Sequence, residues 1–106
     1  MHRFLAAVLF ASVPGLVLAA APPRPAKLGQ CVACHGEEGR SRVAGTPHLG
    51  GQDEVYLAKA LSAYRSGERK SQPMNSLANT LQPADIAALA RWYARRPAVV
   101  GRPEKK

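Results

Sequence analysis

The stretch Cys31-Val32-Ala33-Cys34-His35 decides how this chain folds and what it binds. Two cysteines that are separated by two residues and followed directly by a histidine form the attachment pattern of a c-type haem. On one helical turn the two thiols can each add to one vinyl group of the porphyrin. The histidine then lies under the ring, where its imidazole can bind the iron. The motif therefore predicts one covalently bound haem c per chain, with His35 as an iron ligand.

Three other uses of the cysteine pair remain open from the sequence alone. Cys31 and Cys34 are the only cysteines, which excludes a four-cysteine zinc or iron–sulfur site. A redox-active dithiol needs a βαβ context, and the chain has no strand-like runs. A disulfide between residues so close in sequence would be strained. A metal site of two cysteines with His35 and His48 is the third alternative, although the ligand spacing is poor.

The N-terminal residues are typical of an export signal. Arg3 gives a positive start, residues 4–18 are almost wholly apolar, and Ala19 to Ala21 are small residues that suit a signal peptidase. An apolar run of about 15 residues is short for a membrane span, although a retained anchor is the alternative. We expect residues 1–21 to be a cleaved signal peptide and the mature protein to be periplasmic.

The remaining chain is long enough for one small domain. Domains of this size usually need a staple, a metal or a cofactor, so we expect the haem to form the centre of the core. The expected organisation is an extended proline-rich start over 22–26, a haem domain over 27–97 and a basic flexible tail over 98–106.

Helical patterns occur over three ranges, about 26–35, 53–66 and 83–96, and no strand pattern is present. Asp53 is a suitable N-cap for the second range and Pro83 a suitable first residue for the third. The intervening segments 36–51 and 68–80 read as loops. Residues at helical spacing within the second and third ranges are Val55, Ala58, Leu61 and Tyr64, and then Ile86, Leu89, Ala90 and Tyr93. The pattern predicts a small all-α fold.

The formal net charge of +8 indicates acidic partners. The charge is spread along the chain, at Arg24, Lys27, Arg40, Arg42, Lys59, Arg65, Arg69, Lys70 and Arg91. Export excludes nucleic acid as the partner, so we expect redox proteins with acidic docking faces. A basic surface that merely keeps the protein soluble is the alternative.

The second iron ligand is expected to be Met74, the only methionine once the signal peptide is removed. It follows Pro73 in a segment that reads as an irregular loop between two helices, whereas a methionine that only fills a core gap is normally helical with apolar neighbours. His48 is the rival ligand, and an open sixth position is the third alternative. Thioether ligation raises the reduction potential relative to bis-imidazole ligation.

The chain resembles the small class I cytochromes c, in particular the monohaem bacterial c-553 type and the two-haem c4-like cytochromes that look like a duplicated copy of it. The resemblance is carried by residues 31–36, 47–52, 56–69, Met74 and 85–93. It implies an all-α class I fold with three main helices wrapped around one covalently bound haem. A single C-x-x-C-H motif excludes the two-haem form for this chain.

The resemblance also implies roles for individual residues. Cys31 and Cys34 would form the thioether links, His35 and Met74 would be the axial ligands, and the Pro47 carbonyl would accept the N–H of His35. The last helix would cross the first, with Trp92 or Tyr93 packed on Gly29 or its neighbour.

The function that the resemblance implies is a periplasmic single-electron carrier, not an enzyme, with redox proteins as partners and room for transient contact with membrane complexes. Two alternatives stay open. One is a haem protein whose labile sixth site binds or reduces a small ligand. The other is the haem subunit of a larger periplasmic oxidoreductase.

Overall fold

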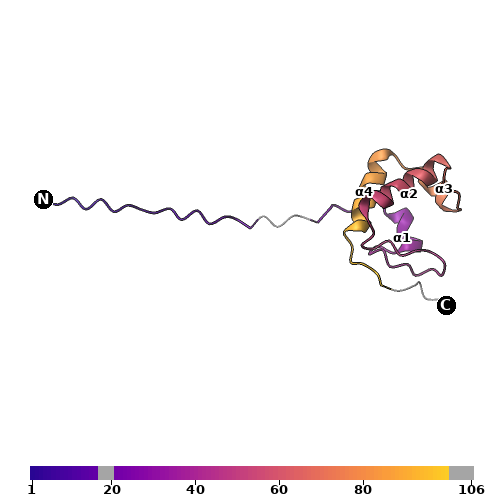
Figure 1. The fold of residues 1–106 in the computed structure, drawn as a ribbon, viewed down its shortest axis with the longest axis horizontal. Coiled ribbons are helices and arrows are strands. Elements are labelled where there is room, and N and C mark those ends of the chain that lie inside the picture. The colour runs from indigo at the N-terminus through magenta and orange to yellow at the C-terminus, as the bar shows by residue number, and fades with distance from the viewer. Residues whose placement is uncertain (17–20, 101–106) are drawn as a thin grey trace.

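Four helices surround a central space in the computed structural model, which describes residues 1–16 and 21–100. They are α1 (Gly29–His35), α2 (Glu54–Ser66), α3 (Met74–Ala78) and α4 (Pro83–Ala94), and the described residues contain no strand. Residues 1–16 have no regular secondary structure and extend away from the helices as an arm (Figure 1). The all-α fold with three main helices is confirmed, and α3 is a short fourth helix.

The two longer helices begin where the sequence predicts, because local side chains cap them. The Asp53 carboxylate accepts the backbone N–H of Tyr56 at 2.7 Å, and α2 ends before Gly67. At the start of α4 the Asp85 side chain accepts the backbone N–H of Gln82 at 2.8 Å, in a reciprocal capping arrangement. These caps satisfy backbone donors that would otherwise lack partners at a helix start.

The core lies mainly between α2 and α4, which pack against each other. Its buried residues are Leu28, Leu57, Leu81, Ile86, Leu89, Ala90, Trp92 and Tyr93. Two of these anchor the segment that follows α1, since the Trp92 indole N–H donates to the Glu37 carbonyl at 2.8 Å and the Tyr93 hydroxyl donates to the Gly36 carbonyl at 2.9 Å. The end of α4 therefore positions the end of the haem motif.

The predicted start of α1 was wrong. Helix α1 begins at Gly29, after a turn over 26–28, rather than at about Ala26. Val55 lies in α2 as its spacing predicts but is 62% exposed, and Leu57 is the α2 residue buried in the core. The last helix was expected to pack Trp92 or Tyr93 on Gly29 or its neighbour, and the neighbour Leu28 lies in the same buried core as both aromatic residues. A Cβ added at Gly29 would meet nothing within 4 Å, so the core is filled at Leu28.

The predicted loop over 68–80 also contains helix α3, so Met74 begins a helix rather than lying in an irregular loop. Five residues are too few to show helical periodicity in a sequence. The turn that precedes α3 is closed by Asn75, whose side-chain oxygen accepts the backbone N–H of Ser71 at 2.8 Å. A local side-chain bond of this kind favours a turn that leads into a helix.

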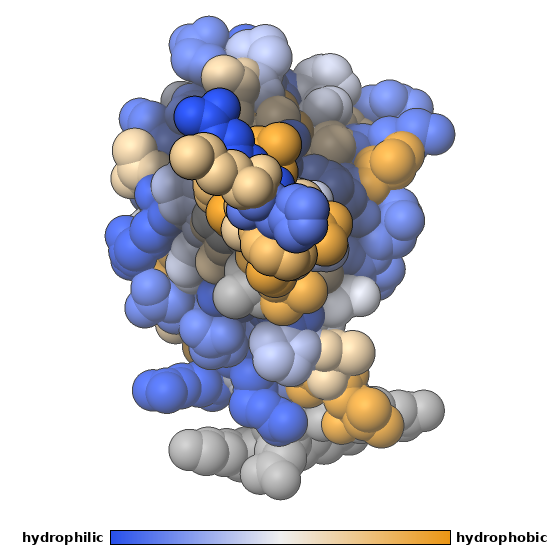
Figure 2. Space-filling view, turned by 90° about the vertical axis from the view of Figure 1, so that its left-hand side faces the viewer, coloured by the Kyte–Doolittle hydropathy of each residue, from blue (hydrophilic) through white to orange (hydrophobic). Residues whose placement is uncertain are grey.

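Residues 1–16 and 98–100, near the two ends of the chain, lie outside the four helices. No helix among residues 1–16 and 21–100 is both long enough and apolar enough to cross a membrane. The exposed large hydrophobic residues lie mostly in the arm, and Figure 2 looks along it toward a largely hydrophilic surface. Ala98 and Val99, in the predicted tail, lie against Gly51 and Gly50 respectively. Residues 17–20, which belong to the predicted signal peptide, and residues 101–106 of the predicted tail lie outside the described residues.

Candidate functional site

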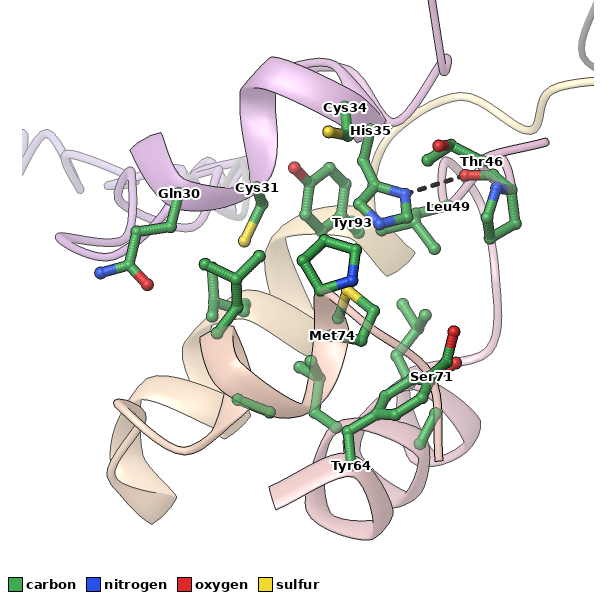
Figure 3. Close-up of a pocket in the computed structure, with 18 of the residues that line it drawn as sticks. Gln30, Cys31, Cys34, His35, Thr46, Leu49, Tyr64, Ser71, Met74 and Tyr93 are labelled. Atoms are coloured by element: carbon green, nitrogen blue, oxygen red, sulfur yellow. Dashed lines mark hydrogen bonds between the residues drawn. The ribbon is translucent and has the colours of Figure 1, made fainter. Parts of the chain in front are cut away.

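The residues of the C-x-x-C-H motif face a cavity of about 330 Å³ in the middle of the fold. Cys31, Cys34 and His35 approach it from α1, and Met74 approaches it from the start of α3 (Figure 3). Pro47 contributes from the long loop between α1 and α2. The structure thus brings together all five site residues that the sequence predicts.

The orientation of the His35 ring is fixed by a backbone carbonyl of the loop between α1 and α2. The side chain of His35 is buried, and Nδ1 lies 2.9 Å from the carbonyl oxygen of Pro47. A carbonyl only accepts, so Nδ1 carries the proton and the lone pair is on Nε2, the nitrogen on the cavity side of the ring (Figure 3). Burial lowers the pKa of His35, although the Pro47 carbonyl partly opposes this shift. The imidazole is therefore neutral near pH 7.

The loop that carries Pro47 is fixed by Ser41 and His48, two residues whose positions the sequence did not predict. The Ser41 hydroxyl lies 3.0 Å from the carbonyl oxygens of Cys34 and Val43, and the Ser41 backbone N–H donates to His48 Nδ1 at 2.8 Å. Nothing in the sequence marks a serine in a glycine-rich loop as the residue that holds the loop in place. His48 lines the cavity, but the rival ligand already uses one ring nitrogen to hold the loop.

Cys31 lacks the lowered pKa that is typical of a reactive cysteine. Burial raises the pKa of Cys31 to about 11, so its thiol is protonated near pH 7. Redox-active and metal-binding cysteines instead have lowered pKa values in electropositive surroundings. Residues 1–16 and 21–100 also contain no group of three or more histidine, cysteine or acidic residues that could hold a metal ion. Neither a thioredoxin-like dithiol nor a two-cysteine, two-histidine metal site gains support here.

Met74 is positioned by its neighbour in sequence, Asn75. The Asn75 side-chain NH₂ donates to the carbonyl oxygens of Tyr64 and Arg69, each at 2.8 Å, and its oxygen accepts the N–H of Ser71. One amide thus ties the end of α2, the following turn and the start of α3 together. Met74 is half-buried, and its side chain reaches into the cavity below His35 (Figure 3).

The rest of the cavity wall fits a flat apolar cofactor. Its aliphatic lining residues are Leu49, Leu57, Ala60, Leu61, Leu77, Ala78, Leu81, Leu89 and Ala90. An apolar wall excludes water from a porphyrin face, while two thiols, one imidazole and one thioether supply the groups that anchor a c-type haem. The donor set and the lining therefore match haem c.

Comparisons with known proteins agree with this match. The cytochrome c family model matches residues 25–93. Cytochrome c-554(548) of Halomonas halodenitrificans is 41% identical over 71 residues, which cover 64% of this chain and 86% of that protein. The thiosulfate dehydrogenase electron acceptor of Thiomonas intermedia is 41% identical over 78 residues, which cover 73% of this chain and 35% of that protein.

A solved structure shows the same fold. Reduced recombinant cytochrome c4 from Pseudomonas stutzeri superposes with a TM-score of 0.60 at 35% sequence identity, over 69% of this chain and 43% of that one. The chain thus spans less than half the length of this cytochrome c4 and of the Thiomonas protein, and most of the length of the Halomonas protein.

Proposed function

The chain belongs to the cytochrome c family, and on that premise we propose that it is a periplasmic single-electron carrier with His35 and Met74 as axial ligands. Membership implies a haem c that is bound covalently through Cys31 and Cys34. The bound haem supplies a one-electron iron couple, and a thioether ligand raises its potential relative to bis-imidazole ligation. In this proposal the chain spans a signal peptide over 1–21, a short proline-rich start over 22–26, the haem domain over 27–97 and a basic tail over 98–106.

The observation that carries the ligand assignment is the placement of His35 and Met74 on one cavity. His35 keeps Nε2 free because Nδ1 donates to Pro47, an outer contact of the kind that orients a ligating ring and increases its basicity. Among the described residues, Met74 supplies the only sulfur from outside the motif on the cavity wall. With both positions filled, oxygen and peroxide have no place to bind, which favours electron transfer over catalysis.

We further propose that the protein is not an enzyme. No aspartate, glutamate or lysine lines the cavity, so the described residues place no carboxylate or amine base there. The buried His35 makes its one assigned hydrogen bond to a backbone carbonyl rather than to a substrate-facing group. General acid–base catalysis requires a titratable group within hydrogen-bonding reach of the reacting atom. Apart from the residues that would bind the haem, the described cavity wall offers only His48, Arg69 and three tyrosines.

The expected partners are redox proteins with acidic docking faces, including periplasmic dehydrogenases and membrane complexes. The full chain carries a net charge of +8, of which Arg3 in the proposed signal peptide supplies one, and the remaining +7 supports electrostatic steering toward such faces. Among the described residues, three ion pairs use arginines, namely Arg24, Arg91 and Arg96, so most of the positive charge stays available. The Thiomonas relative is a thiosulfate dehydrogenase electron acceptor, which supports a dehydrogenase as one class of electron donor.

Absorption spectra of the wild-type protein and of Met74→Ala test this function. The wild-type protein should give a low-spin c-type spectrum with a sulfur-to-iron charge-transfer band that carbon monoxide does not change. Met74→Ala should keep covalent haem, lose that band, bind carbon monoxide and have a lower midpoint potential. Leu77→Ala is the matched control, because Leu77 lies on the same helix and the same cavity but cannot bind iron.

Two outcomes would redirect the proposal. Uptake of carbon monoxide by the ferrous wild-type protein at neutral pH would support a haem that binds or reduces a small ligand. Stable co-purification with a catalytic protein would instead make this chain the haem subunit of a larger periplasmic oxidoreductase.

A further inference from the structure

We infer that residues 96–99, which we call the C-terminal strap, position the proposed iron ligand His35. The strap lies against the turn over 49–51, and this turn ends the loop whose Pro47 carbonyl accepts the His35 N–H. The inference rests on the proposed function, since it concerns how the chain orients a haem ligand. It assigns a task to a segment that follows the last helix and that lies far from His35 in the sequence.

The backbone of the strap is in direct contact with the turn over 49–51. Beyond α4 the chain leaves the helices on the side of the loop between α1 and α2 (Figure 1). A Cβ added at Gly50 would lie 2.6 Å from the Pro97 carbonyl oxygen. A Cβ added at Gly51 would lie 2.5 Å from the Ala98 Cα. Backbone this close leaves no space for a side chain, so the turn cannot move outward unless the strap moves with it.

The inner side of the same turn is held by the segment that follows α1. The N–H groups of Leu49 and Gly50 donate to the Gly39 carbonyl at 2.8 and 3.1 Å. A Cβ added at Gly50 would also lie 2.7 Å from the Glu38 carbonyl oxygen. The turn is therefore enclosed between residues 36–39 on one side and the strap on the other.

Arg96 anchors the start of the strap. Its guanidinium lies over the Trp92 ring, 4.1 Å from the centroid, and its Nη1 is 3.7 Å from Glu38 Oε2. The Arg96 side chain is only 17% exposed, and a cation over an indole contributes more when it is shielded from water. The Tyr93 carbonyl accepts the N–H groups of both Arg96 and Gly51, at 3.1 and 3.0 Å. One carbonyl at the end of α4 thus joins the strap to the turn.

Val99 anchors the other end of the strap. Its side chain is half-buried, and its Cγ2 would be 3.3 Å from a Cβ added at Gly50. The next residue, Val100, is 92% exposed. Two adjacent valines therefore differ in whether they cover the turn, and only the first removes apolar surface from water by doing so.

The strap acts on His35 from behind the loop. The described cavity wall includes Pro47 and Leu49 but none of the four strap residues. The Pro47 carbonyl, two residues before Leu49, lies 2.9 Å from His35 Nδ1. A contact of this kind orients a ligating ring and increases its basicity. Loosening the strap should release the turn, lengthen this hydrogen bond and leave a less basic imidazole, which favours ferrous iron.

Solvent exchange of the His35 Nδ1 proton tests the inference, measured by NMR in the ¹⁵N-labelled, haem-loaded full chain. The strap variants are Arg96→Gln and Val99→Asn. Their matched controls are Arg95→Gln and Val100→Asn, because Arg95 and Val100 are exposed neighbours of the same residue types. Each strap variant should exchange the proton about tenfold faster, the size expected when one hydrogen bond is lost. Each should also have a raised midpoint potential, while the controls should match the wild type.

Exchange rates and potentials equal to those of the controls in both strap variants would overturn the inference. An equal acceleration of the Leu89 amide proton in the core of α4 would also overturn it, because the strap would then contribute only global stability. Val99→Asn keeps the test decisive if Arg96→Gln fails to take up haem. Failure of the proposed function would be recognised separately, since His35 keeps its Nδ1 proton whether or not Met74 is the second ligand.

Discussion

The two sides of the haem cavity are built in different ways. On the α1 side, Cys31, Cys34 and His35 follow one another within five residues, and the Pro47 carbonyl is only 12 residues further along the chain. On the α3 side, Met74 comes from a five-residue helix. The Asn75 amide ties that helix to the backbone carbonyls of Tyr64 and Arg69, and Tyr64 lies 11 residues earlier in the chain.

The difference shows where each side is vulnerable. The α1 side is shaped by its backbone, because Gly39 allows the loop to fold back so that its carbonyl accepts the N–H groups of Leu49 and Gly50 at 2.8 and 3.1 Å. The α3 side depends on a single amide with three partners. We therefore expect defects on the first side to affect folding and defects on the second to affect the proposed Met74 ligand.

Gly39→Ala should give the largest effect of the variants that leave the ligands unchanged. Gly39 has φ +76°, and an added Cβ would lie 2.6 Å from the Gly50 Cα, so both backbone strain and a backbone clash result. We expect a loss of unfolding free energy on the order of 3 kcal/mol and a reduced yield of haem-loaded protein. Denaturant unfolding followed by Soret absorbance measures the loss.

Gly45→Ala is the control for Gly39→Ala. Gly45 has a similar φ of +80°, but a Cβ there meets nothing within 4 Å. Only the strain remains, which costs about 1–2 kcal/mol. Equal losses in the two variants would mean that the close approach of Gly39 to Gly50 does not hold the loop in place.

Asn75→Ala should give an intermediate effect confined to the α3 side. Removal of the amide leaves the Arg69 carbonyl and the Ser71 N–H without their protein partner and takes one of two donors from the Tyr64 carbonyl, which keeps the Gly67 N–H; the loss costs about 1–3 kcal/mol. Covalent haem should remain, while the sulfur-to-iron band weakens and carbon monoxide binding increases. Absorption spectra with and without carbon monoxide measure both changes.

Asn79→Ala serves as the matched control for Asn75→Ala. Asn79 is an exposed asparagine at the other end of α3. We expect its substitution to leave the band unchanged. A normal band and no carbon monoxide uptake in Asn75→Ala would show that the α3 side is as self-supporting as the α1 side, and the contrast between them would be lost.

Tyr93→Phe should give the smallest effect and should depend on pH. Burial raises the pKa of Tyr93 above its ordinary value, so the folded state keeps a proton that the unfolded state releases above about pH 10. The tyrosine's contribution is therefore fully present below pH 10 and is lost as the pH rises further. At pH 7, loss of the hydrogen bond to the Gly36 carbonyl should cost about 1 kcal/mol.

Unfolding free energies of Tyr93→Phe and wild type at pH 7 and pH 11 test this expectation. The deficit of Tyr93→Phe should shrink at pH 11, because the variant has no hydroxyl to ionise. Tyr64→Phe is the control, since its ring can still lie under the Arg69 guanidinium. A deficit that is constant with pH would mean that the Tyr93 proton does not contribute to stability.

The sequence predicted the α1 side of the site more completely than the α3 side. The C-x-x-C-H motif and the caps at Asp53 and Pro83 depend on residues close together in the chain, and both capped helices start where they were expected. Short-range geometry is readable because a helical turn or a cap has only a few backbone solutions. The helix at Met74 was missed because five residues show no periodicity and its tie to Tyr64 crosses a turn.

By itself, the sequence determined the cofactor, its two cysteine anchors, the all-α class and the approximate extent of the longer helices. These features follow from local chemistry that a short segment contains in full. Only the tertiary structure decided that Leu28 rather than Gly29 enters the core, that Ser41 and His48 hold the Pro47 loop, and that Arg69 stands alone among the cavity residues as a cation. These depend on which distant side chains fill the same volume, and close packing settles that only once the whole chain has folded.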